Sequence, residues 1–256
     1  MTRAGAEDRI AAPGTDESRW AAWLPGQDWP CWTPDRAWRE VAVCAAHPDD
    51  EVLGAGGVLS ALAAAGMAVH LVAVSAGEAS HPGSTVLTPA DLAGRRVAET
   101  GRALAALGVR ARTTRLRLPD SGLAGREPEV TAALVDAVTG ADAVLSTWTG
   151  DAHPDHEAVG RAALVAGRAH GLPVWQFPVW TWHWVVPDDD RVPWAQARAV
   201  PLSPAARAAK RTAVDCFATQ VRPLGPDPAD RAVLPPEVPA HFDRDVEVLL
   251  SAALPS

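Results

Sequence analysis

The chain has 256 residues, enough for one α/β domain of ordinary size with an extension. Hydrophobic residues make up 48% of it and charged residues 21%, which excludes the low hydrophobicity of a disordered chain. The formal net charge of -8 excludes a broadly positive surface for phosphate backbones, so we expect no nucleic-acid partner.

No secretory signal or membrane span is recognisable in the sequence. The N-terminal segment MTRAGAEDRIAAPGTDESRW has no continuous apolar region, and no later stretch is apolar for about eighteen residues. We therefore expect a cytoplasmic protein. Cys31, Cys44 and Cys216 are too few and too far apart for a disulfide framework or a CxxC metal site, and we expect reduced, mostly buried thiols.

Residues 1–38 are rich in proline, glycine and charge, yet they hold many large aromatic side chains: Trp20, Trp23, Trp29, Trp32 and Trp38. Such rings are mostly buried in folded proteins. We therefore predict that residues 1–38 form a Trp-rich arm docked on the body, and that residues 39–256 form the main domain.

From residue 41 onward, short apolar runs alternate with alanine-rich helical stretches, a pattern typical of βαβ units. It predicts an α/β fold with a mainly parallel central sheet. The expected strands are 41–46, 69–75, 113–118, 142–147 and 173–179. The expected helices are 54–66, 90–107, 128–138 and 157–170, with Gly66, Gly108 and Gly171 as stops.

Prolines break this alternation in the last third of the chain, where one further helix is predicted at 203–217. The order and pairing of elements in this part stay open. If the segment 175–184 (WQFPVWTWHW) is extended, Trp180, Trp182 and Trp184 share one face. These rings then either stack on a sugar or pack in the core against the N-terminal tryptophans. His183, on the other face, is expected to approach the cleft.

Two clusters of histidine and aspartate follow predicted strands. AHPDDE (46–51) comes directly after strand 41–46, and DAHPDH (151–156) comes after strand 142–147. In an open α/β sheet, ligands bind beyond the carboxyl ends of the strands. We therefore expect both clusters to meet in one cleft.

The residue types in these clusters suit a catalytic zinc site, which uses three nitrogen or oxygen ligands and keeps one position open. His47, Asp50 and His156 supply that set. Asp49, next to a ligand, is predicted to be the general base, and His153 remains for the oxyanion and the leaving amine. Capping of the following helices is an alternative explanation for the acidic residues of either cluster alone, but it does not require histidines in both turns.

The sequence AHPDDE, followed by LGAGGVLSALAAAG and then by HPDH, resembles the LmbE-like, or PIG-L, family of N-acetylglucosaminyl deacetylases. The similarity covers roughly residues 41–250 and leaves the arm aside. It extends through these further positions: Arg96-x-x-Glu99, Leu118 to Gly122, Lys210, Phe217 to Gln220, His241-Phe242 and Glu247.

The resemblance implies a Rossmann-like three-layer fold that binds zinc, or sometimes ferrous iron or another divalent metal, through His47, Asp50 and His156. It implies Asp49 as the base and His153 as its electrostatic partner. It also implies that Arg96 and Asp120 hold the substrate sugar, and we expect Asp155 to support the ligands from behind. Some members place a tyrosine near the scissile carbonyl, and this chain has none.

Plainer interpretations of these positions stay open. Arg96 and Glu99 are three residues apart on a helix and could form a surface ion pair. Asp120 lies in a Pro-Asp-Ser-Gly turn, where aspartate is common for backbone reasons. The segment Gly54-Ala55-Gly56-Gly57 lacks the spacing of a dinucleotide loop and indicates close packing of helix on strand.

We therefore expect a metal-dependent hydrolase that removes an N-acyl group, foremost acetyl, from a small molecule containing an amino sugar. One alternative is a deacylase of another N-acyl metabolite. A second is a non-catalytic protein of the same fold that binds a sugar or nucleotide. The oligomeric state is left open.

Overall fold

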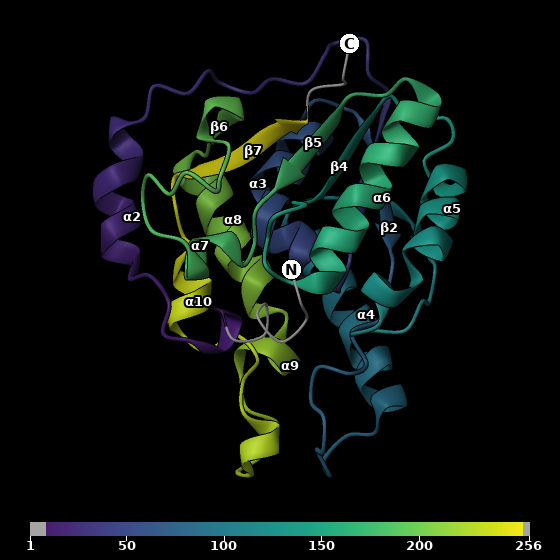
Figure 1. The fold of residues 1–256 in the computed structure, drawn as a ribbon, viewed down its shortest axis with the longest axis vertical. Coiled ribbons are helices and arrows are strands. Elements are labelled where there is room, and N and C mark those ends of the chain that lie inside the picture. Colours follow the sequence, from purple (N-terminus) through teal and green to yellow (C-terminus); the bar gives the residue numbers. More distant parts are fainter. Residues whose placement is uncertain (1–8, 253–256) are drawn as a thin grey trace.

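The computed structural model describes residues 9–252 and has an α/β fold, with one seven-stranded sheet between two layers of helices (Figure 1). The strand order is β3-β2-β1-β4-β5-β7-β6. Strands β1 to β5 pair in parallel, and β7 is antiparallel to both of its neighbours. The mainly parallel sheet predicted from the sequence is confirmed. The strands are β1 (Glu40–Ala45), β2 (Ala68–Ala73), β3 (Ala111–Arg115), β4 (Ala143–Thr147), β5 (Val174–Phe177), β6 (Ala197–Pro201) and β7 (Val246–Ala252).

Helices α3, α4 and α8 contribute to the core on one face of the sheet, and α5 and α6 contribute to the core on the other. The α-helices are α2 (Glu17–Trp23), α3 (Asp50–Ala64), α4 (Pro89–Ala106), α5 (Glu127–Ala137), α6 (Pro154–His170), α7 (Thr181–Trp184), α8 (Pro204–Asp215), α9 (Ala218–Val221) and α10 (Glu237–Ala240). Short 3-10 helices cover Leu24–Gly26, Leu123–Arg126, Trp194–Gln196 and Pro228–Asp230.

Strand β1 shows why both faces of the sheet need cover. Val41 and Val43 pack into one core and Ala42 and Cys44 into the other, because successive side chains of a strand point to opposite faces. All four are fully buried. A strand that is apolar on both faces is typical of a parallel sheet covered by helices on each side.

Two helices begin earlier than expected. The helix expected at 54–66 begins at Asp50, and the one expected at 157–170 begins at Pro154. Their first turns begin with residues of the polar clusters, which carry no apolar periodicity and therefore give no helix signal. The stops were predicted correctly, since Gly66, Gly108 and Gly171 follow their helices with positive φ angles.

The tryptophan segment is a strand only as far as Phe177, the end of β5, so the condition under which its rings would share one face is not met. Residues 181–184 form the short helix α7, so Trp180, Trp182 and Trp184 do not share one face by alternation. The backbone N–H groups of residues 179–181 all donate to the carboxylate of Asp151, which curls the chain at this point. The last third also adds strands β6 and β7, which the apolar pattern did not reveal.

The described part of the arm lies against the body. Trp20 is fully buried, and its Nε1 donates to the carbonyl of Trp182 at 2.8 Å. Trp29 stacks on Trp194 with ring centroids 5.6 Å apart. The division into arm and domain stays a prediction, and residues 1–8 lie outside the described part. The expectation of mostly buried thiols is wrong, because Cys44 is buried but Cys31 is exposed and Cys216 is partly exposed.

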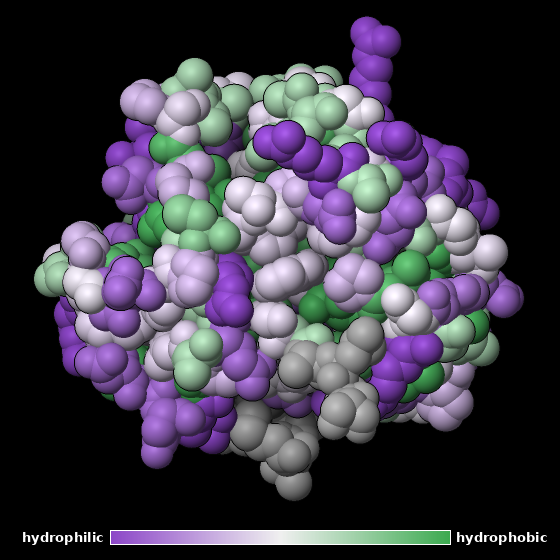
Figure 2. All heavy atoms as spheres, turned by 90° about the horizontal axis from the view of Figure 1, so that it is seen from above, coloured by the Kyte–Doolittle hydropathy of each residue, from purple (hydrophilic) through white to green (hydrophobic). Residues whose placement is uncertain are grey.

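The face seen from above in Figure 2 mixes hydrophilic and hydrophobic residues, and the hydrophobic ones form small, separated patches. Within residues 9–252, no helix combines the length and the apolar character needed to cross a membrane.

Candidate metal centre

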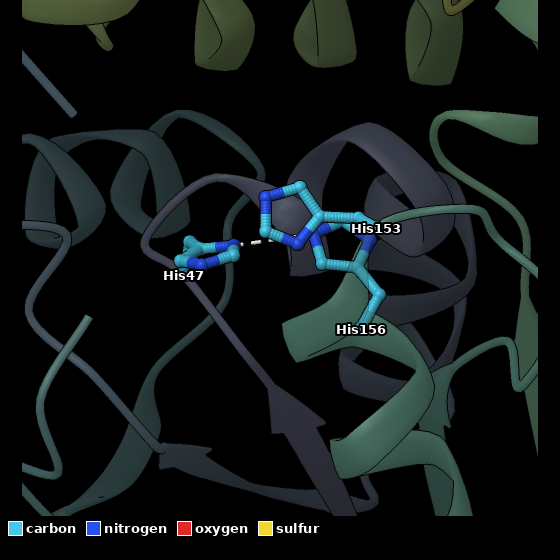
Figure 3. A group of neighbouring side chains, drawn as sticks. All are labelled: His47, His153 and His156. Carbon is cyan, nitrogen blue, oxygen red and sulfur yellow. Dashed lines mark hydrogen bonds between the residues drawn. The ribbon is translucent and has the colours of Figure 1, made fainter. Parts of the chain in front are cut away.

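The two predicted clusters meet at the carboxyl end of the sheet. Strand β1 leads into the loop that carries His47, and the neighbouring parallel strand β4 leads into the start of α6, which carries His156. Neighbouring parallel strands end at the same edge of a sheet, so the loops that follow them lie together. Figure 3 shows the rings of His47, His153 and His156 gathered there.

Three expected metal ligands converge in this group. His47 Nδ1 lies 3.1 Å from His156 Nε2, and His156 Nε2 lies 3.2 Å from Asp50 Oδ1. His47 Nδ1 is also 3.6 Å from Asp50 Oδ2. These separations are short enough for all three side chains to bind one ion through bonds of about 2 Å.

The outer nitrogens of both rings contact carboxylates. His47 Nε2 lies 3.1 Å from Asp120 Oδ1 and 3.4 Å from Asp155 Oδ2, and His156 Nδ1 lies 2.7 Å from Asp151 Oδ2. An outer nitrogen that donates its proton to a carboxylate leaves a lone pair on the inner nitrogen of a neutral ring. Two such lone pairs and the Asp50 carboxylate then face one point. This donor set fits a divalent metal.

The charges around this point favour a bound cation. Burial lowers the pKa of His156, but Asp50 and Asp151 outweigh it and raise that pKa to about 9. Burial opposes ionisation of Asp50 as well, yet His156 and His47 hold its pKa well below the usual value. A proton therefore occupies the centre when a metal does not, and metal binding has to displace it.

Asp151 is a site residue that sequence reasoning missed. Besides His156, its fully buried carboxylate accepts hydrogen bonds from the backbone N–H groups of Val179, Trp180 and Thr181, each at 2.9 Å. It thereby fixes the orientation of the His156 ring and the course of the chain before α7. Its place at the start of DAHPDH was the only available signal.

Asp49, the expected base, pairs with an arginine of α4. Its Oδ2 pairs with Arg96 Nη2 at 3.1 Å, and it stands at the N-cap of α3 without a capping hydrogen bond from its side chain. Its φ of 128° is a rare value that costs energy in any residue but glycine. Burial raises its pKa to about 7, against the opposing charge of Arg96. A buried carboxyl group with such a pKa suits general-base catalysis near neutral pH.

His153 caps α6, and its Nδ1 accepts from the backbone N–H of Asp155 at 3.2 Å. This bond assigns the ring proton to Nε2. Burial holds the pKa of His153 well below its usual value, so the ring is neutral. It stacks on His156 at 4.6 Å between ring centroids, and each of His47, His153 and His156 offers a nitrogen within 4.8 Å of the others (Figure 3). His153 is therefore close enough to be a ligand itself.

The plainer interpretation of Arg96 and Glu99 as a surface ion pair is wrong, because both are buried and bind other partners. Arg96 donates to the carbonyls of Pro48, at 2.6 Å, and Gly77, at 3.1 Å. Glu99 accepts from the backbone and the hydroxyl of Thr219. Arg96 thus binds the loop that carries His47 and Asp49.

Asp120 does more than shape its turn. One of its oxygens accepts from the backbone N–H of Ala79 at 2.8 Å, and the other contacts His47. Despite burial, His47 holds the pKa of Asp120 below the usual range. Asp155, expected behind the ligands, contacts the same nitrogen of His47 and accepts from Leu123 N at 3.0 Å.

All expected site residues line one cavity of about 1230 Å³. Trp180 and His183 line it too, whereas Trp182 packs in the core beside Trp20. The core interpretation is confirmed for Trp182, and stacking of a sugar on Trp180 stays a prediction. The cavity is also bounded by residues 10–14 of the arm and by residues 231–238.

A parallel sheet with a three-donor centre at its carboxyl edge is the architecture of a metal-dependent α/β enzyme. The family model for PIG-L, described as GlcNAc-PI de-N-acetylase, matches residues 42–166. Residues 42–166 are therefore similar to the PIG-L, or LmbE-like, family, as the motifs implied. No curated protein matches the sequence.

Several solved structures share the fold. The A40926 pseudoaglycone deacetylase Dbv21 is 24% identical with a TM-score of 0.56, over 85% of this chain and 97% of its own. N,N'-diacetylchitobiose deacetylase from Pyrococcus horikoshii is 18% identical with a TM-score of 0.54, over 81% and 82%. The 4-carboxy-2-hydroxymuconate hydratase GalB from Pseudomonas putida is 18% identical with a TM-score of 0.56, over 85% and 98%. Because one of them is a hydratase, the fold alone does not define a deacetylase.

Proposed function

We propose that this protein is a metal-dependent amide hydrolase that removes an N-acyl group, foremost acetyl, from a small molecule containing an amino sugar. The observation that carries this proposal is the convergence of His47, Asp50 and His156 in a cavity that a second buried carboxylate, Asp49, also lines while it pairs with Arg96. The description of the matching family as a de-N-acetylase supports it.

A divalent metal held by His47, Asp50 and His156 supplies a Lewis acid that polarises the amide carbonyl and makes water more acidic. Zinc is the metal we propose, with ferrous iron or another divalent ion as the alternative. The remaining steps fall to the protein. Asp49 takes a proton from water, and Arg96 orients its carboxylate through the contact at 3.1 Å.

His153, beside His47 and His156, completes the proposed chemistry. Its Nε2 proton is available to hydrogen-bond the oxygen that gains negative charge, because Nδ1 is held by the backbone of Asp155. Asp120 and Arg96 line the same cavity and are proposed to contact the sugar, with Arg96 also holding Asp49.

The proposal is tested with a panel of N-acetylglucosamine conjugates, read by released acetate and free amine. We expect hydrolysis that stops after treatment with a chelator and returns when zinc or ferrous iron is added. Asp49→Asn protein is the matched control, because it lacks the proposed base and shows how much acetate is released without it. Stoichiometric metal in the protein, together with no hydrolysis of any N-acyl sugar, would instead indicate a binding protein of the same fold.

A further inference from the structure

Two chain segments far from the metal ligands in sequence give the cavity an apolar wall. Residues 10–13 (Ile-Ala-Ala-Pro) belong to the arm, and residues 232–236 (Ala-Val-Leu-Pro-Pro) precede α10. We call these two stretches together the apolar wall. Both lie outside residues 42–166, the part matched by the family model. The family model therefore does not cover the two stretches that form the wall.

The arm is fixed at the cavity by a set of contacts with α7. His183 Nε2 bonds to the carbonyl of Ala12 at 2.9 Å, and Thr15 donates from its backbone to the carbonyl of His183 at 2.8 Å. The hydroxyl of Thr15 donates to the carbonyl of Val185 at 2.6 Å. Gly14 packs so closely on the His183 ring that a Cβ there would lie 2.2 Å from Nδ1, so only glycine fits.

A second anchor ties the arm to the chain that follows α10. Glu17 accepts hydrogen bonds from the buried guanidinium of Arg244 at 2.6 and 2.7 Å, and it pairs with His241 Nδ1 at 2.6 Å. Figure 1 accordingly shows the arm, in purple, passing beside α10. The arm is thus held in place by hydrogen bonds and ion pairs. In the second stretch of the wall, Leu234 N donates to the carbonyl of Gln220 at 2.9 Å.

The dimensions of the cavity leave room for more than one sugar. Its volume of about 1230 Å³ exceeds the roughly 300–1,000 Å³ that holds a drug-sized ligand. Around the metal centre its lining is polar, with Asp49, Asp120 and His153. At the wall it is apolar, and residues 11–13 are exposed. A substrate that fits both regions has a polar sugar and an apolar substituent.

On the basis of the proposed deacylase function, we propose that the substrate is an amino sugar bearing an apolar substituent, and that the apolar wall binds this substituent. The N-terminal arm is then a determinant of substrate specificity. The substituent is either an aglycone on the anomeric oxygen or a long N-acyl chain. Both present hydrocarbon to the wall, and burial of hydrocarbon supplies the affinity.

The test measures ligand binding by calorimetry to Asp49→Asn protein, so that no ligand is turned over. The ligands are the methyl β-glycoside of N-acetylglucosamine, its hexyl β-glycoside, and the methyl β-glycoside of N-hexanoylglucosamine. We expect at least one of the two ligands with a six-carbon substituent to bind about tenfold more tightly than the methyl β-glycoside of N-acetylglucosamine. Which of the two does so identifies the aglycone or the acyl chain as the occupant.

Ile10→Ser and Val233→Ser, each made in the Asp49→Asn background, should reduce this preference at least about threefold, because each replaces hydrocarbon on the wall with a hydroxyl. The matched control is Val165→Ser, at a valine that is 39% exposed on α6 and does not line the cavity, and it should keep the full preference.

Equal affinity for all three ligands, or a preference that survives both wall substitutions, overturns the proposal. Absence of hydrolysis by the unmodified protein contradicts the proposed function instead. Binding is measured without turnover. Even if the unmodified protein shows no hydrolysis, tighter binding of a ligand with a six-carbon substituent that depends on the wall would therefore still support the apolar site.

Discussion

Asp49 and Asp50 have the same side chain and adjacent positions, but their surroundings differ. Asp50 is the first residue of α3, contacts His156 and His47, and accepts the backbone N–H of His47 at 2.8 Å. Asp49 precedes the helix with a φ of 128° and pairs with Arg96. At the start of α3, the two neighbouring carboxylates therefore bind different partners.

From this difference we predict that the two amide variants fail in different ways. Asp49→Asn should keep its metal while the rate of hydrolysis falls by about 10² to 10⁴, the usual contribution of a general base. Asp50→Asn should lose metal affinity, with partial rescue of activity by added zinc. Metal content by elemental analysis and turnover are measured for both variants. Equal metal loss in the two would show that the base is wrongly assigned.

Asp151 and Asp142 flank strand β4 at its two ends and form a natural pair for comparison. Asp151 follows the strand and bonds to His156, whereas Asp142 precedes it and accepts from the backbone of Arg39 and Glu40. We predict that Asp151→Asn lowers zinc affinity about 10- to 100-fold, as loss of a carboxylate behind a metal-bound histidine does. Asp142→Asn should leave zinc affinity unchanged. A zinc titration of both variants tests this prediction. Wild-type zinc affinity in Asp151→Asn would contradict the role of Asp151 in orienting His156.

At the scale of elements, helix α3 is interrupted at Ala55, where the backbone leaves helical geometry. The carboxylate of Glu247, from β7, accepts from the backbone N–H groups of Gly57 and Val58 at 2.7 and 2.8 Å. It also pairs with Lys210 Nζ of α8 at 2.6 Å. The buried ion pair thus connects β7, α8 and α3. Helix α3 is the one whose first residue, Asp50, belongs to the metal centre.

We predict that Glu247→Ala destabilises the fold by about 3–5 kcal/mol, because it leaves the buried Lys210 charge without its partner. The matched control is Glu129→Ala, which removes an exposed pair with Arg126 and should cost less than about 1 kcal/mol. Urea unfolding followed by circular dichroism measures both. A small effect of Glu247→Ala would mean that Lys210 reaches solvent or another acceptor.

At the scale of the whole molecule, the metal centre joins the loop after β1 to the start of α6, segments about a hundred residues apart. A ligand that binds only the folded protein stabilises it by about 2.7 kcal/mol at a hundred times its Kd. For a chain of this size we therefore predict that zinc raises Tm by about 5–10 °C and that a chelator reverses the rise. Thermal melts monitored by circular dichroism test this. His156→Ala protein should show no shift, and an equal shift there would place the metal elsewhere.

The sequence was sufficient for the parts of the molecule that local pattern controls. Apolar runs at 41–46 and 142–147 correspond to β1 and β4, because a strand buried on both faces must be apolar along its length. The two polar clusters that follow these runs indicated the metal centre, because parallel strands bring their carboxyl ends to one edge. Helix starts were less predictable, since Asp50 and Pro154 begin helices without apolar periodicity.

Only the tertiary structure decided the features that depend on partners distant along the chain. The Arg96 contact with Asp49 spans 47 residues, and the Asp151 contacts with residues 179–181 span up to 30. The seating of residues 10–14 at the cavity rests on contacts with His183, 171 residues away from Ala12. None of these contacts leaves a periodic trace in the sequence, because each joins a single polar group to a backbone or side chain that packing alone brings within reach.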